Sequence, residues 1–220
     1  MKAAMVGMDR TMAMPPKSAV DLLLLLAMWW VMMVGMMLPS VAPMILTFAS
    51  INRNRRNRGE PYAPAALFTA GYLLAWGGFS VAATLAQWAL ERAALLSPMD
   101  MTTDSRLLGG VLFLAAGLYQ FTPVKLACLR VCRSPIDFVV NHWRDGLVGA
   151  LRMGLTHGLY CLGCCWILML LLFVGGVMNL LWVAALGGAV LAEKLTPGPW
   201  IGRIGGGLMM AYGVWLLAIG

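Results

Sequence analysis

In this chain of 220 residues, 61% of the residues are hydrophobic and only 11% are charged. Ordinary soluble domains carry about 25% charged residues, so this composition excludes that class and is typical of a membrane protein. The net charge of +7 does not indicate a nucleic-acid partner, because Lys and Arg in a membrane protein mainly report its orientation. We therefore predict an all-α, polytopic membrane helix bundle with no nucleic-acid partner.

Six apolar runs are long enough to cross the roughly 30 Å hydrocarbon core of a bilayer. They extend over about residues 19–50, 63–90, 107–126, 151–174, 178–192 and 199–220. The fifth run is short, and Gly175 and Gly176 before it predict a tight hairpin with the fourth run. The sequence thus predicts about six transmembrane helices in one bundle domain, residues 19–220.

The N-terminal tail, residues 1–18, carries five of the 18 methionines of the chain. Thioethers bind Cu(I) without forming disulfides, so such a tail outside the cytoplasm is similar to the capture tails of copper transporters. Met99 and Met101, in the second loop, would lie on the same side. The alternative is that the tail only follows the Met-rich composition of the chain.

Two prolines interrupt the first apolar run. Pro39 and Pro43 have no backbone N–H, so carbonyls one turn earlier lose their helical partners and the helix must kink or break there. Such backbone is tolerated at membrane depth where it is buried or lines a cavity, so we expect the kink to face the fourth run. Met32 and Met36 share one helical face and are candidate metal ligands, with core packing as the alternative.

The third run ends in a basic segment that contains two cysteines. Cys128 and Cys132 stand four residues apart, which places them on one helical face if the helix continues past Pro123. In the predicted topology they lie at the cytoplasmic membrane boundary, where their thiols could release a metal ion. Two cysteines by themselves do not define a site.

The fourth run carries metal-binding residue types in the middle of an apolar helix. His157, Cys161 and Cys164 share one helical face, because residues three, four and seven apart lie together, and Cys165 lies at the edge of that face. Imidazole and thiolate ligands suit Cu(I), and after it zinc, far better than a hard cation. The alternative is that the cysteines pack as small hydrophobic residues while His157 hydrogen-bonds to a neighbouring helix.

The charged residues between the runs predict the orientation of the chain. Eleven of the 16 Lys and Arg residues flank the first, third and fifth loops, and five lie elsewhere. Basic loops stay in the cytoplasm, so we predict an N-out, C-out topology in a bacterial inner membrane. Glu193 and Lys194 end the fifth run, and we expect them near the interface, where they can snorkel or form an ion pair.

Three segments together resemble a bacterial family known as the predicted metal-binding integral membrane proteins. They are the Met and Pro-Ser element at 33–40, Tyr-Gln-x-Thr-Pro-x-Lys-x-x-Cys-x-x-x-Cys-Arg-x-Pro at 119–135, and His-Gly-x-x-Cys-x-Gly-Cys-Cys-Trp at 157–166. The resemblance covers nearly the whole chain after the Met-rich tail. It implies a bacterial inner membrane protein that binds metal, and it names no substrate, reaction or partner.

These features favour a membrane protein that binds Cu(I) and passes it across the bilayer or to a partner metalloprotein. A second hypothesis is a thiol-disulfide oxidoreductase in which Cys161 and Cys164 exchange disulfides. A third is a non-catalytic subunit or assembly factor of a larger membrane complex. Metal binding predicts that loss of His157 is as harmful as loss of a cysteine, whereas a dithiol enzyme should tolerate it better.

Overall fold

The computed structural model describes residues 18–93, 95–96, 103 and 105–219, and all regular elements among these residues are helices. The predicted all-α class is therefore confirmed. The Met-rich tail, apart from Ser18, lies outside the described residues, and so do Met99 and Met101.

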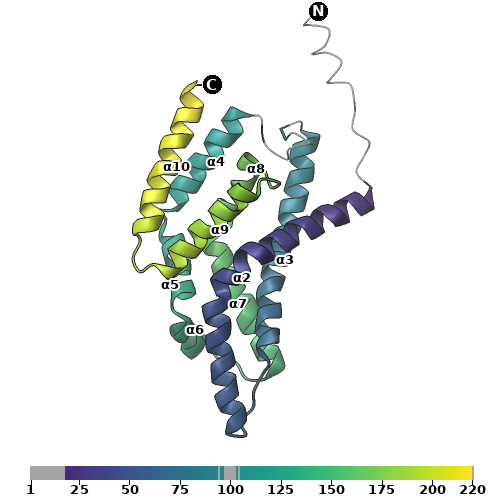
Figure 1. Cartoon of the computed structure of the whole chain (residues 1–220), viewed down its shortest axis with the longest axis vertical. Coiled ribbons are helices and arrows are strands. Elements are labelled where there is room, and N and C mark those ends of the chain that lie inside the picture. The colour runs from purple at the N-terminus through teal and green to yellow at the C-terminus, as the bar shows by residue number, and fades with distance from the viewer. Residues whose placement is uncertain (1–17, 94, 97–102, 104, 220) are drawn as a thin grey trace, which may run out of the picture.

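The helices follow one another with short connections. They are α2 (Ala19–Asn57), α3 (Ala65–Arg92), α4 (Arg106–Tyr119), α5 (Pro123–Arg133), α6 (Pro135–His142), α7 (Gly146–Leu170), α8 (Leu172–Gly175), α9 (Leu180–Leu195) and α10 (Trp200–Ile219). Figure 1 shows the connection between α2 and α3 at the lower end of the molecule and the end of α10 at the upper end.

Four helical segments are long and apolar enough to cross a membrane, as judged by length and composition. They are α2, α3, the joined segment Gly146–Gly175 and α10, and α4 with α5 adds a fifth if this pair, bent by 65°, is one span. Helix α9 has 16 residues, whereas a bilayer core of about 30 Å needs about 20. The prediction of about six transmembrane helices is therefore wrong.

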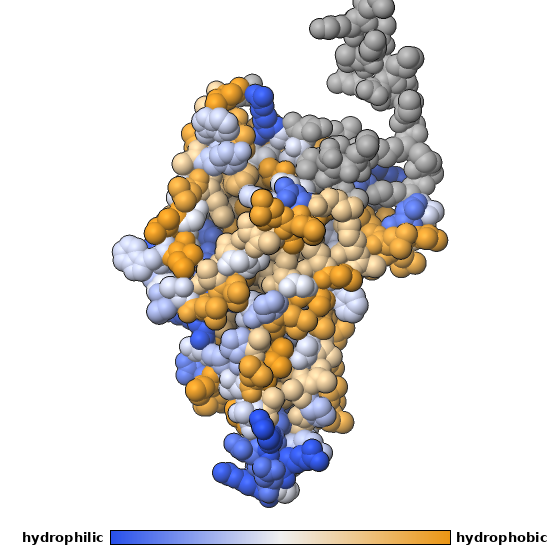
Figure 2. Space-filling view, in the orientation of Figure 1, coloured by the Kyte–Doolittle hydropathy of each residue, from blue (hydrophilic) through white to orange (hydrophobic). Residues whose placement is uncertain are grey.

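The surface of the molecule agrees with a membrane environment for its middle part. Hydrophobic residues cover most of the face in Figure 2, and hydrophilic residues gather at the lower tip. This tip is formed by the end of α2 and the following loop, where Arg53, Arg56 and Arg58 are exposed.

Helix α2 continues through both of its prolines. Ser18 and Asp21 form a capping box at its start, in which each side chain accepts a hydrogen bond from the backbone of the other residue. Pro39 and Pro43 lie inside the helix, and Figure 1 shows α2 changing direction along its length. The predicted kink is present, and the helix is bent rather than broken.

Helices α3 and α7 approach so closely that only glycine fits at two contact points. A Cβ atom on Gly154 would lie 1.9 Å from the carbonyl oxygen of Phe68, and one on Gly71 would lie 2.1 Å from that of Leu151. Small residues allow such backbone contact in membrane helices. The contact fixes the rotation of α7 about its axis, which decides which of its side chains point inward.

We expect Gly154→Ala to lower the free energy of unfolding by about 1–3 kcal/mol, because the added methyl group would overlap a backbone oxygen. Thermal unfolding of the detergent-solubilised protein, followed by tryptophan fluorescence, measures this change. Gly78→Ala on α3 is the matched control, since nothing lies within 4 Å of its added Cβ. Equal unfolding temperatures for the two variants would contradict the close contact.

The third apolar run is divided between two helices. Helix α4 ends at Tyr119, and α5 begins with Pro123 in its first turn. Thr122 caps α5 by accepting a hydrogen bond from the backbone N–H of Lys125. The bend between the two helices lays α5 against α7, so the two cysteines of α5 reach those of α7.

Candidate metal centre

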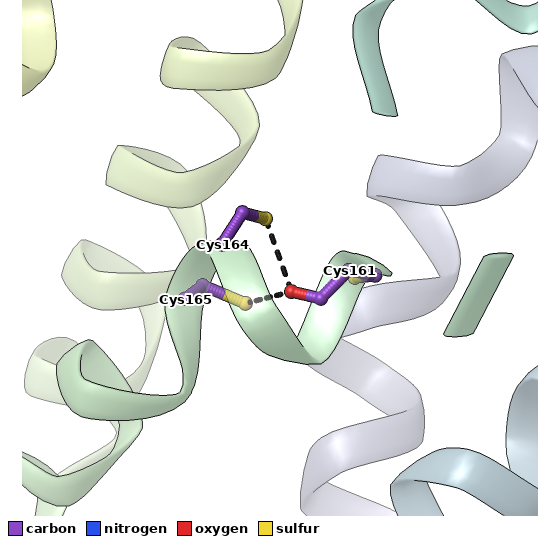
Figure 3. A group of neighbouring side chains, drawn as sticks. All are labelled: Cys161, Cys164 and Cys165. Atoms are coloured by element: carbon purple, nitrogen blue, oxygen red, sulfur yellow. Dashed lines mark hydrogen bonds between the residues drawn. The ribbon is translucent and has the colours of Figure 1, made fainter. Parts of the chain in front are cut away.

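Three cysteines of α7 form a compact buried group. The sulfur atoms of Cys161, Cys164 and Cys165 all lie within 4.8 Å of one another, and each residue is at most 1% exposed. The thiols of Cys164 and Cys165 both donate to the carbonyl oxygen of Cys161, each over 3.0 Å (Figure 3). Cys165, which the sequence placed at the edge of the helical face, is thus a full member of this thiol cluster.

The spacing of the thiol cluster suits a single soft ion. A metal bound about 2.3 Å from sulfur holds any two sulfur atoms at most about 4.6 Å apart. The sulfur atoms of the cluster already lie within 4.8 Å of one another, so small rotations of the side chains would bring them onto one ion. Thiolates are soft ligands, and they select Cu(I) or zinc over hard cations.

A buried lysine reaches the thiol cluster from α9. The Nζ atom of Lys194 lies 3.0 Å from Sγ of Cys161 and 2.8 Å from Oγ of Ser40, and the residue is only 8% exposed. The side chain of Lys194 is thus buried against Cys161 and does not extend outward. A buried ammonium group needs a partner of opposite charge, and Cys161 would supply one as a thiolate.

Tyr72 and the kinked part of α2 complete the surroundings of Cys161. The hydroxyl oxygen of Tyr72 lies 3.1 Å from Sγ of Cys161 and 3.4 Å from the carbonyl oxygen of Met37. The hydroxyl of Ser40 donates to the same carbonyl over 2.9 Å. Met37 and Ser40 in the kinked segment therefore face the Cys-bearing helix, whereas Pro39 and Pro43 themselves are exposed, so the predicted orientation of the kink holds for its neighbours and not for the prolines.

The two cysteines of α5 lie beside the thiol cluster. Cys132 is within range of electrostatic interaction with both Cys161 and Cys164. Cys128 packs against Gly163 of α7, where an added Cβ atom would lie 2.7 Å from its sulfur. The sequence placed these residues at a separate release point, whereas the bend before α5 brings them to the cysteines of α7.

His157 occupies an aromatic enclosure one helical turn from Cys161. Its ring centroid lies 4.9 Å from that of Phe138, 6.0 Å from that of Phe68 and 6.2 Å from that of Tyr72. The residue is 2% exposed, and its Nδ1 atom has no hydrogen-bond partner. His157 therefore lies near the thiol cluster but outside the set of atoms that are close enough to share one ion.

Met32 and Met36 face away from the thiol cluster, toward α9. Both line a cavity of about 780 Å³ between α2 and α9, and the side chain of Met36 lies against Gly187. Neither cysteine nor histidine is among the residues that line this cavity. The sequence grouped these methionines with the cysteines of α7, and the structure gives them surroundings of their own.

A buried ionic network lies next to Lys194 along the chain. The carboxylate of Glu193 accepts from Nζ of Lys125 over 2.6 Å and from the side-chain amide of Gln120 over 2.9 Å. The guanidinium group of Arg133 donates to the carbonyl oxygen of Glu193 over 2.8 Å. Glu193 thus pairs with α5 rather than with Lys194, and these bonds fix the end of α9 against α5.

Sequence reasoning missed three residues of this centre, namely Lys194, Tyr72 and Ser40. The available signal was the length of the fifth apolar run, because a helix too short to cross the bilayer can end among neighbouring helices. Tyr72 carried no signal, since a tyrosine in an apolar run has no distinctive neighbours in the sequence.

The fold and the thiol cluster define a helical protein with several helices apolar enough to cross a membrane and a buried site suited to a soft metal ion. Residues 26–216 match the PpoB2 family of copper chaperones, so the chain belongs to that family. No curated protein and no solved structure matches the chain. Membership of a copper chaperone family agrees with the resemblance to metal-binding bacterial membrane proteins, and the matched range includes the thiol cluster and Lys194.

Proposed function

We propose that this protein is a membrane-embedded copper chaperone that holds Cu(I) on the thiolates of α7 and delivers it to a partner metalloprotein. The observation that carries the proposal is the thiol cluster itself, three buried sulfur atoms within 4.8 Å with the ammonium group of Lys194 on Cys161. Packing alone would not require a positive charge beside buried cysteines, whereas a bound metal–thiolate complex would.

Charge balance favours Cu(I) on two thiolates. Such a complex has one net negative charge, which would be costly in an apolar interior, and the ammonium group of Lys194 cancels it. The third thiol of the cluster and that of Cys132 stay protonated and available as incoming ligands. A partner could then withdraw the ion through stepwise ligand exchange, in which copper remains Cu(I) throughout.

Zinc fits the same residues less well. A structural zinc site needs four ligands in a tetrahedral arrangement, which here would recruit Cys132 together with the three cysteines of the thiol cluster. Zinc on four thiolates has two net negative charges, and Lys194 cancels only one. Copper is therefore the proposed cargo.

The proposed setting is a bacterial inner membrane with both termini outside the cytoplasm. The exposed arginines at the lower tip support this orientation, because Lys and Arg concentrate in cytoplasmic loops. Reporter fusions in the loop after α2 and at the C-terminus test it directly. An external location for the arginine loop would reverse the orientation.

Copper retention tests the proposed function. Purified protein in detergent is loaded anaerobically with Cu(I), washed with a chelator and measured for copper per chain. Cys161→Ser and Cys164→Ser should each remove about one equivalent, because thiolates are the ligands that hold this ion. Cys128→Ser is the matched control, since its thiol lies outside the thiol cluster and should leave retention unchanged.

Two outcomes would contradict the proposal. The first is equal copper retention by the wild type and a folded variant in which Cys161, Cys164 and Cys165 are all serine. The second is an oxidant-dependent change in the gel mobility of the protein that requires Cys161 and Cys164, in the absence of copper binding. This result would favour the thiol-disulfide oxidoreductase. His157→Ala adds a further distinction, because a ligand role for the imidazole requires a loss of copper similar to that of the Cys variants.

A further inference from the structure

The cavity between α2 and α9 is lined by thioethers. Met28, Met32 and Met36 stand four residues apart on α2 and share one helical face, and Met178 faces them from the segment before α9. The cavity has a volume of about 780 Å³. Four thioethers around one space are a soft, uncharged ligand set, which suits Cu(I) and does not suit hard cations.

The kink of α2 adds a polar group to this apolar wall. Pro39 has no N–H, so the carbonyl of Gly35 lacks the donor that it would have in a regular helix, and both residues line the cavity. A carbonyl oxygen without its helical donor presents partial negative charge to the space beside it. The cavity is thus bordered by a residue whose carbonyl lacks the donor of a regular helix.

The cavity and the thiol cluster lie on opposite sides of the same segment of α2. Met36 and Pro39 line the cavity, whereas the carbonyl of Met37 and the hydroxyl of Ser40 contact Tyr72 and Lys194 beside Cys161. Helix α9 also borders both, since Gly187 lines the cavity and Lys194 reaches Cys161. Helix α2 therefore stands between the cavity and the thiol cluster.

We propose that this cavity is a second Cu(I) site, in which the thioethers of Met28, Met32, Met36 and Met178 bind the ion before it moves to the thiol cluster. The proposal rests on the proposed function of copper handling. Movement of Cu(I) from the thioethers to the thiolates is electrostatically favourable, because the cation passes from neutral ligands to anionic ones. Copper remains Cu(I), and only metal–sulfur bonds are exchanged.

Copper stoichiometry in two backgrounds tests this site. Wild-type protein in detergent should hold about one more equivalent of Cu(I) than the Cys161→Ser, Cys164→Ser, Cys165→Ser variant, which keeps the ion in the cavity. Adding Met28→Leu, Met32→Leu, Met36→Leu and Met178→Leu to that variant should remove the remaining ion. Leucine preserves volume and apolar character, so the fold is retained.

Two matched double variants distinguish the loss of cavity ligands from a general loss of methionine. Met32→Leu with Met36→Leu should weaken the residual site, whereas Met33→Leu with Met37→Leu, on the same helix but buried in the core, should leave it unchanged. Thioethers carry no proton, so the affinity of the residual site should change less than about threefold between pH 7 and pH 5, while thiolate sites weaken.

The outcomes distinguish this inference from the proposed function. Loss of all copper in the triple Cys variant overturns the thioether site and leaves the chaperone proposal standing. Residual copper that survives all four Met→Leu substitutions also overturns it, because other residues then hold the ion. If the copper content does not change with the Cys substitutions but falls with the Met substitutions, the result supports the thioether site and contradicts the thiol centre. No copper on the wild type overturns both.

Discussion

Replacing Lys194 with methionine is expected to lower the affinity for Cu(I) by on the order of 100-fold, which corresponds to about 2.7 kcal/mol. Two unit charges 4 Å apart interact by about 4 kcal/mol at an effective dielectric constant of 20, and relaxation of the site offsets part of this. The ammonium group lies 3.0 Å from Sγ of Cys161, so its loss leaves the copper–dithiolate complex with an uncompensated buried charge. Methionine keeps the length and apolar stem of lysine.

Competition with a chromophoric Cu(I) chelator at fixed pH measures this affinity. Lys194→Arg should retain most of the affinity, because it keeps the charge. Arg203→Met removes an exposed cation from α10 and serves as the matched control, with no expected effect. An unchanged affinity in Lys194→Met would show that the cation has no part in holding the ion.

Replacing Glu193 with glutamine is expected to lower the free energy of unfolding by about 3–5 kcal/mol, because it leaves a buried cation without its counter-charge. Nζ of Lys125 lies 2.6 Å from the carboxylate of Glu193, and the side chains are 2% and 5% exposed. The same network holds the end of α9 against α5. Glu193→Gln should therefore also reduce copper retention, since Lys194 follows directly in the chain.

Unfolding in mixed detergent with increasing sodium dodecyl sulfate measures the stability. Lys125→Met alone should destabilise the protein by a similar amount. The double variant Lys125→Met, Glu193→Leu should recover most of the loss, because replacing both members of a buried ion pair by apolar residues is often neutral. Additive losses in the double variant would contradict the pairing.

Composition and apolar run length predicted the helical class correctly, because an apolar chain in a membrane must satisfy its backbone hydrogen bonds within helices. They overestimated the number of transmembrane helices, because the run that forms α9 was counted as one. The sequence shows how long a run is, but a run of 16 residues can also be an internal helix that ends among its neighbours. In the third run, Pro123 indicated only that a helix could end there. The sequence did not show that a second helix, α5, begins at this proline.

Helical periodicity correctly grouped Cys161 and Cys164, since residues three apart on one helix must lie together. It could not show what faces them from other helices. Cys132 reaches the thiol cluster because of the bend between α4 and α5, and Lys194 reaches it from α9, 33 residues along the chain. Periodicity also grouped His157 with the cysteines, although the neighbouring aromatic rings give it different surroundings.

The position of Lys194 so late in the chain has a consequence for biosynthesis. The cysteines of α7 leave the ribosome well before α9, so for part of synthesis they lack the ammonium group that faces Cys161 in the finished protein. A nascent chain that ends before α9 therefore has the thiols without their counter-charge. Under the proposed function, high-affinity copper binding is therefore expected only of a chain that includes α9, and shorter products are not expected to compete for the ion.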